Sequence, residues 1–287
     1  MNVKLFRVIF FVSLILSANS ALAQSSSKPN LIIKPKVNDD NSVDFKYLKE
    51  GIGSYVAVVE FTKLLNSETT GKQVVNVNED TGVLFKLKPI DTTKKIDLSF
   101  RYAVHRGFLN PKIDSTTVYY LPFEKNKKIK TYDIYRQGFD NNQWKAHRVY
   151  STTQDTVFAM RKGQVVEIRS LFSTSANDAT GALTSVEKKE IILQHPDNTF
   201  TSYFDIDDKT ILVKPGDVLS AHQPLCLMAS YLDKNKNVKF TTRFKIYYLV
   251  FNDADFSPSE KTIDAHFLTG NGIEKLVSKT EYTVAIP

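Results

Sequence analysis

The side chains that most often carry enzyme chemistry are few in this chain of 287 residues. It has five histidines, at positions 105, 147, 195, 222 and 266, and a single cysteine, Cys226. A catalytic zinc ion needs three protein donors in a tight cluster, and no spacing among these residues predicts one. Cys226 lies in an apolar run, which favours a packing role, because a reactive thiol needs partial exposure and a nearby base.

Other catalytic signatures are equally scarce. The sequence has no Gly-x-Ser-x-Gly nucleophile motif, no phosphate-binding P-loop and no dinucleotide-binding glycine pattern. Carboxylates are abundant, but nothing in one sequence selects a glycosidase pair among them. Motifs alone therefore do not predict an enzyme.

The N-terminus indicates export. Lys4 and Arg7 precede an almost wholly apolar run at residues 8–16, and a small-x-small pattern follows and ends at Ala23. This order is that of a signal peptide, residues 1–23, which signal peptidase removes. The apolar run is about half the roughly 20 residues that span a bilayer, so a retained anchor is the weaker interpretation. We expect a protein of the periplasm or the exterior of a bacterium, with no transmembrane anchor after cleavage.

The formal net charge is +7, a mild excess spread over many lysines. Such a charge suits contact with anionic polymers of the cell wall or outer membrane, although an ordinary solvated surface explains it as well. The sequence has no dense basic cluster with interleaved aromatic residues. Nucleic acid is therefore not predicted as a partner.

Strand signals dominate the chain after a short polar leader at residues 24–30, which we expect to be disordered. Runs rich in β-branched and aromatic residues occur at 54–61, 82–87 and 96–102, and turn-prone stretches separate them. Several short strands at this spacing predict a β-sandwich, which we place at residues 30–118.

A second β-rich region follows at residues 119–287. Helical periodicity is weak everywhere, and its best candidate, residues 174–187, is better explained as a long polar loop. The sequence therefore predicts an all-β protein of two domains.

Four blocks in the second region share an order and spacing with a known family. They are Tyr120–Phe123 followed by Gln137 and Gly138, a strand-turn-strand element at 157–167, the segment 191–206, and a Val-x-x-Gly-Asp type of segment within 211–219. Together they resemble the lysostaphin-type (LytM-type) zinc peptidases, in the branch that carries an N-terminal β-sandwich. The resemblance implies an antiparallel sheet with a substrate groove along one face.

The resemblance also implies a specific chemistry. Members of the family cleave peptide bonds in peptidoglycan with a zinc ion that is held by a His, an Asp and a second His. A water molecule fills the fourth position and is activated by the metal. A further His, two residues before the last ligand, assists proton transfer.

The expected donors are replaced in this chain. Arg148 stands at the position of the Asp ligand, and the segment upstream of it, residues 140–145, contains no His for the first ligand. The His of the Tyr-x-His-Leu segment becomes Asp205. The two histidines of the final His-Leu-His-Phe motif become Lys245 and Tyr247. A cationic side chain cannot bind zinc, so we expect no metal and no other cofactor.

The first hypothesis is therefore a catalytically inactive, peptidase-like envelope protein. It would bind peptidoglycan or a cell-wall hydrolase through the former substrate groove. Inactive members of the family are known as regulators that activate cell-wall amidases, although a shared fold does not fix a function.

Two alternatives remain open. One is an active zinc metalloendopeptidase with shifted ligands, for which His147 and Asp205 with one other donor are the candidates, although His147 should point to the opposite face of its strand. The other is a structural or carbohydrate-binding protein whose sandwich presents aromatic residues, for which Tyr55, Tyr102 and Phe108 are the candidates.

Overall fold

The computed structural model describes residues 30–135, 144–176, 183–251 and 257–286. The predicted signal peptide and the leader up to residue 29 lie outside these residues. Strands form nearly all the regular structure that is described, and one 3-10 turn, η1 (Asp208–Thr210), is the only helical element among them. The all-β prediction is thus confirmed. None of the helical structure described is long and apolar enough to cross a membrane.

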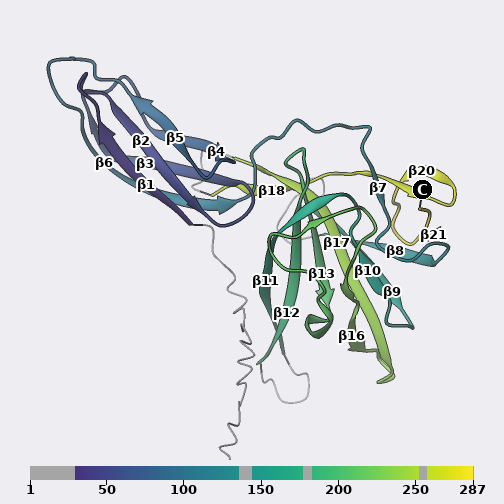
Figure 1. The fold of residues 1–287 in the computed structure, drawn as a ribbon. Helices are drawn as coiled ribbons and strands as arrows, with labels where there is room; N and C mark the ends of the chain where they lie inside the picture. Colours follow the sequence, from purple (N-terminus) through teal and green to yellow (C-terminus); the bar gives the residue numbers. More distant parts are fainter. Residues whose placement is uncertain (1–29, 136–143, 177–182, 252–256, 287) are drawn as a thin grey trace, which may run out of the picture.

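The N-terminal region is a sandwich of two three-stranded antiparallel sheets (Figure 1). One sheet has the order β1 (Asn30–Val37), β2 (Val43–Glu50), β5 (Thr81–Leu87), and the other has the order β4 (Lys72–Val77), β3 (Tyr55–Leu65), β6 (Asp97–Arg106). The sheets share one apolar core, in which the Phe45 ring contacts those of Phe61, Phe85 and Phe100 at centroid distances of 5.7, 4.5 and 5.0 Å.

Strand β3 is buried on both faces over Tyr55–Val59. Tyr55, Ala57 and Val59 enter the core of the sandwich, whereas Val56 and Val58 pack against the C-terminal region. Successive side chains of a strand point to opposite faces. A strand covered on both sides therefore shows a continuous apolar run rather than alternation.

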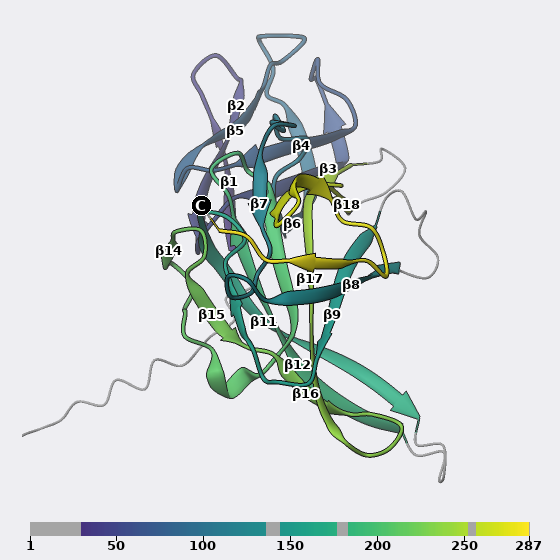
Figure 2. The same ribbon diagram turned by 90° about the vertical axis from the view of Figure 1, so that its right-hand side faces the viewer.

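The C-terminal region is built on one large, largely antiparallel sheet (Figures 1 and 2). Its main path runs through β14 (Val218–Leu219), β11 (Gly163–Ala176), β12 (Leu183–Gln194), β13 (Phe200–Ile206), β17 (Val238–Val250), β9 (Lys145–Ser151), β8 (Lys128–Tyr135) and β21 (Glu281–Thr283). Two short strands, β16 (Ala229–Leu232) and β18 (Ser259–Thr262), also pair with β17. The long strand β17 is thus the centre of the sheet.

Shorter elements cover one face of this sheet. They are the pair β10 (Thr156–Phe158) and β15 (Pro224–Leu227), and the sheet of β20 (Gly272–Lys275), β19 (His266–Thr269) and β7 (Val118–Tyr120). Side chains of both layers, including Tyr119, Phe244 and Phe267, form the main core of the molecule. The opposite face of the sheet is left to polar residues and to the sandwich.

The polar loop predicted at residues 174–187 is wrong in part. Strands β11 and β12 pair from Gln164 with Gln194 to Ala176 with Leu183, with one register shift between Val165 and Glu167. Residues 174–176 and 183–187 therefore form the distal part of a long hairpin, and residues 177–182 lie outside the described residues. The segment is rich in Ser and Thr and lacks a clear apolar alternation, on which the prediction relied, so the strands were not recognised.

A third apolar cluster joins the two regions. Val56 and Val58 of the sandwich pack with Val166, Ile192 and other residues of the sheet. Beside the cluster, Arg106 pairs with Glu167 at 3.2 Å between Nε and Oε2, and both side chains are largely buried.

The chain crosses from one region to the other soon after Arg106, where the sandwich ends, rather than near residue 118. Leu109 already forms a parallel bridge with Leu249 of the large sheet. Gly107 has a φ of +141°, and a Cβ atom there would overlap the Leu249 side chain. Only glycine combines this backbone conformation with so close an approach.

Candidate functional site

Strand alternation places the residues at the substituted zinc positions on one face of the sheet. On β17, Phe244 and Ile246 enter the main core, so Arg243, Lys245 and Tyr247 lie on the opposite face. Arg148 of β9 stands directly opposite Arg243 in the register of the two strands. We call this surface the polar face.

Asp205 reaches the polar face through a β-bulge. Lys189 pairs with Ile206 and Glu190 pairs with Phe204, which leaves Asp205 as the extra residue. Its φ is +50°, in the left-handed region that Asp tolerates better than most residues. Bulges of this kind re-aim a side chain. The bulge therefore turns the Asp205 carboxylate toward β17 and β9.

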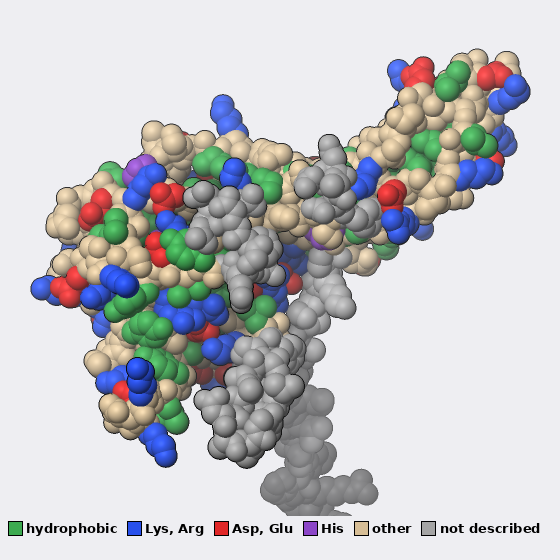
Figure 3. Space-filling view, turned by 180° about the vertical axis from the view of Figure 1, so that it is seen from behind, with side chains coloured by type: hydrophobic (Ala, Val, Ile, Leu, Met, Phe, Trp, Pro, Cys, Tyr) green, Lys and Arg blue, Asp and Glu red, His purple; other side chains and the backbone are tan. Residues whose placement is uncertain are grey.

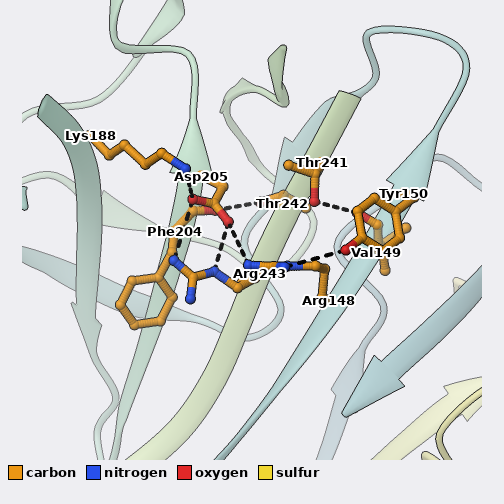
Figure 4. Close-up of polar contacts among 9 residues, drawn as sticks. All are labelled: Arg148, Val149, Tyr150, Lys188, Phe204, Asp205, Thr241, Thr242 and Arg243. Atoms are coloured by element: carbon orange, nitrogen blue, oxygen red, sulfur yellow. Dashed lines mark hydrogen bonds and ion pairs between the residues drawn. The ribbon is translucent and has the colours of Figure 1, made fainter. Parts of the chain in front are cut away.

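Three cations from three strands converge on this carboxylate (Figure 4). Arg243 donates from Nε to Oδ2 at 2.7 Å and from Nη2 to Oδ1 at 3.3 Å. Lys188 donates to Oδ1 at 3.0 Å, and the Nη2 atom of Arg148 lies 3.5 Å from Oδ2. We call Asp205 and these three residues the Asp205 cluster.

The Asp205 cluster carries an excess of positive charge at its surface. The Asp205 side chain is only 1% exposed, whereas those of Arg148, Arg243 and Lys188 are 27%, 24% and 40% exposed. Burial raises the pKa of the Asp205 carboxyl, but Arg243 and Lys188 lower it more, so the net shift is downward. One ionised carboxylate thus faces three cations, which leaves two positive charges available to an outside anion.

A second charged cluster lies further along the polar face, and its cation is buried. The Lys245 ammonium pairs with Glu260, and its side chain is 3% exposed. It also lies 4.5 Å from the ring centroid of Tyr247 and 5.2 Å from that of Trp144. Trp144 donates from Nε1 to Oε2 of Glu260 at 3.1 Å. We call these residues the Lys245 cluster.

The charges of the Lys245 cluster are satisfied internally. Burial raises the pKa of Glu260, but the attraction of Lys245 lowers it more, and the net shift is downward. The Lys245 ammonium is thus enclosed by its ion pair and by the surrounding aromatic rings. The cluster therefore serves packing rather than binding.

The residues at the substituted positions do not fit a zinc ion. Arg148 and Lys245 are cations, which repel a metal rather than donate to it. Within the described residues, no group of three or more His, Cys, Asp or Glu side chains is placed to hold a metal ion.

The shifted ligands His147 and Asp205 are not brought together. His147 accompanies Phe244 on the core side of the sheet, with its ring 5.5 Å from that of Phe244. Its Nδ1 atom lies 3.0 Å from Oδ1 of Asp133. Asp205 belongs to the polar face, so the sheet separates the two side chains.

Two other reactive groups considered above, Cys226 and His195, lie in the interior. Cys226 is fully buried, and burial raises the pKa of its thiol. His195 is also buried, and its Nδ1 atom is 2.8 Å from the carbonyl oxygen of Lys162. Burial lowers the pKa of His195 to about 4. Both groups are therefore neutral at physiological pH.

The aromatic candidates of the sandwich do not form one surface. Tyr55 is fully buried and Phe108 packs in the cluster between the two regions, whereas Tyr102 is exposed. Of the three candidates, only Tyr102 is thus presented to solvent. No shared aromatic face of the sandwich follows from these residues.

Sequence reasoning missed Lys188 and Arg243. Arg243 stands two residues before Lys245 on the same strand, so alternation could have placed it on the same face. Lys188 could not be found in this way, because its approach to Asp205 depends on the bulge. It also lines a surface hollow of about 340 Å³ together with Lys189, Lys209 and Ser230.

Comparisons with known proteins give little beyond this geometry. No protein-family model matches the chain, and no curated protein does. Among solved structures, the chain is similar to Helicobacter pylori Csd3 in its orthorhombic crystal, with 7% identity and a TM-score of 0.29. The similarity covers 83% of this chain and 72% of that chain. A score of this size does not establish a shared fold.

Proposed function

We propose that the protein is an exported envelope protein that binds peptidoglycan without cleaving it, through the Asp205 cluster on the polar face. The observation that carries the proposal is the placement of Arg148 and Arg243 around the buried Asp205 carboxylate. The resemblance predicts metal donors at this place, and cations that need an anionic partner stand there instead.

The chemistry of the cluster suits a carboxylate ligand. Arginine presents a planar fork of donors that matches a carboxylate, and such charge-assisted bonds are about twice as strong as neutral ones. Asp205 uses only part of the donor capacity of the three cations, and all three side chains reach solvent. Peptidoglycan stem peptides carry free carboxylates, and the predicted export would bring the protein to them.

The test is co-sedimentation of the purified mature protein with isolated sacculi. We expect the wild type to bind and the Arg148→Gln variant to bind about tenfold more weakly, the size expected for one lost contact of about 1.4 kcal/mol. Arg148 makes the longest of the contacts to Asp205, so its loss leaves Arg243 and Lys188 in place. The matched control is Arg101→Gln, which removes an exposed ion pair with Glu60 in the sandwich.

Three outcomes would contradict the proposal. The wild type could fail to sediment with sacculi, or Arg148→Gln and Arg101→Gln could bind equally well. The third outcome is one tightly held zinc ion per chain, measured by elemental analysis after mild zinc loading, together with cleavage of the sacculi. Capture of a cell-wall hydrolase without any binding to sacculi would point to the regulatory alternative instead.

A further inference from the structure

Three tyrosines form a row on the polar face, beyond the Asp205 cluster. Tyr132 of β8 and Tyr150 of β9 have ring centroids 5.5 Å apart, and Tyr150 and Tyr231 of β16 are 5.7 Å apart. Tyr132 pairs with Arg148, and Thr241 of β17 pairs with Tyr150. The register of the strands therefore places the row on the same face as the Asp205 cluster.

The row is open to solvent. Tyr150 is 43% exposed, and Tyr132 and Tyr231 are half-buried. An exposed tyrosine is ordinary when it is isolated, but three in contact across separate strands form a continuous aromatic strip. Figure 3 shows hydrophobic side chains, the class that includes tyrosine, next to Lys and Arg side chains on the C-terminal region.

The strip and the Asp205 cluster are joined by Arg148. Its Nη1 atom donates to the Tyr150 hydroxyl at 3.3 Å, and its guanidinium lies 5.8 Å from the Tyr150 ring centroid (Figure 4). The same side chain reaches Asp205 through Nη2. A ligand that lies along the strip would thus meet the surplus positive charge at Arg148.

The tyrosine strip and the positive charge of the Asp205 cluster together indicate a class of ligand. Tyrosine offers an apolar ring with a polar hydroxyl at its tip, which suits the C–H face and the hydroxyl groups of a sugar ring. The two surplus charges match carboxylates that are spaced along a polymer, rather than one anion on every unit. The rings are inclined to their neighbours at 69° and 58°, so a row of parallel stacked bases does not fit them.

We propose that the tyrosine strip binds the sugar rings of a glycan strand, and that Arg148, Arg243 and Lys188 bind carboxylates on the same strand. The inference rests on the proposed function and deepens it, because it assigns the glycan, and not only the peptides, to the polar face. Tyr132, Tyr150 and Tyr231 then set the preference for saccharide.

The experiment compares two probes, intact sacculi and soluble glycan strands from which an amidase has removed the peptides. We expect the wild type to bind both. Tyr150→Ala should weaken binding to the peptide-free strands by about tenfold, which corresponds to about 1.4 kcal/mol. Tyr150→Phe keeps the ring and should bind nearly as the wild type does.

The matched control is Tyr102→Ala in the sandwich. Tyr102 is also 43% exposed, and its ring stacks on that of Phe100, so the two alanine variants remove similar surfaces. Circular dichroism and thermal melting of each variant separate lost folding from lost binding. A Tyr231→Ala variant, which alters the other end of the strip, gives an independent test if Tyr150→Ala is unstable.

The outcomes separate the two proposals. Binding to sacculi without binding to peptide-free strands would overturn the inference and leave the proposed function standing. Equal binding of the strands by Tyr150→Ala, Tyr231→Ala and Tyr102→Ala would also overturn it. No binding to either probe would overturn both proposals. Displacement of the strands by a single-stranded oligonucleotide of equal length would assign the strip to another polymer.

Discussion

The Asp205 cluster and the Lys245 cluster occupy the same face of one sheet and share one central strand, β17, yet they differ in access to solvent. Asp205 is buried while its three cations reach the surface. In the Lys245 cluster the cation is the buried member, and aromatic rings cover it. The difference shows that the same ionic groups can either stabilise the fold or remain accessible to a ligand. The ion pair of a buried cation stabilises the fold, whereas a solvent-facing cation can exchange its partner for a ligand.

The largest loss of stability is expected for a substitution in the Lys245 cluster. Glu260→Gln would leave the Lys245 ammonium buried without a carboxylate, and loss of one member of a buried pair costs about 3–5 kcal/mol. We expect the lower part of this range, because Glu260 is itself 24% exposed. Urea unfolding of the variant measures the free-energy difference.

Glu60→Gln provides the comparison for that variant, because it breaks a surface pair with Arg101. Exposed pairs contribute about 0–1 kcal/mol. Equal effects of Glu60→Gln and Glu260→Gln on the free energy of unfolding would show that burial does not distinguish the Lys245 cluster from the surface.

The dependence of the free energy of unfolding on pH should distinguish the contribution of His195 from those of the two clusters. The pKa of His195 is lowered to about 4, so the unfolded state binds more protons between about pH 6.5 and 4. Stability should therefore fall as the pH falls through this window, and His195→Gln should flatten the fall. Acid unfolding with urea at fixed pH values measures it. An unchanged slope in His195→Gln would contradict the assignment.

The contributions of Asp205 and Glu260 to stability are lost at a lower pH than that of His195. Their pKa values are lowered in the folded state, so the stability they contribute is complete above the unfolded pKa values, near 4, and is lost as the pH falls below them. The same scan should thus show a second fall below about pH 4, which Asp205→Asn reduces.

Asp205→Asn should have an intermediate effect at neutral pH. The variant leaves three cations around a neutral amide, and loss of a buried partner of charged groups costs about 1–3 kcal/mol. The cost is moderated because Arg148, Arg243 and Lys188 can turn toward solvent. A larger loss in this variant than in Glu260→Gln would reverse the comparison between the clusters.

The smallest effect on stability is expected for Arg148→Gln. Its contact with Asp205 is long and its side chain is partly exposed, so we expect a change in the free energy of unfolding of about 0.5 kcal/mol or less. The binding test above expects a clear loss for the same variant. Stability unchanged and binding reduced would mark Arg148 as a ligand-binding residue.

The fold was predictable where the chain alternates or runs apolar. The segments 54–61, 82–87 and 96–102 contain or overlap strands β3, β5 and β6, because β-branched and aromatic residues pack well on a pleated surface. The distal part of the β11–β12 hairpin was missed, since its Ser and Thr residues show no clear apolar alternation.

The candidate site was predictable only in part. The positions of Arg148 and Asp205 came from the resemblance, whereas their meeting depends on a bulge of one residue at Asp205. Nothing in the local sequence predicts such a bulge. The contacts of Lys188 and of the tyrosine strip join different strands, and the register of the sheet brings them together.

The apolar cluster between the sandwich and the large sheet has a consequence for how the molecule unfolds. Val56 and Val58 belong to a strand that also builds the core of the sandwich, so the two regions share a strand rather than a thin linker. Separating them would expose apolar surface on both sides. Calorimetry should therefore record one cooperative heat-absorption peak for the whole protein, whereas two independent units would give two peaks.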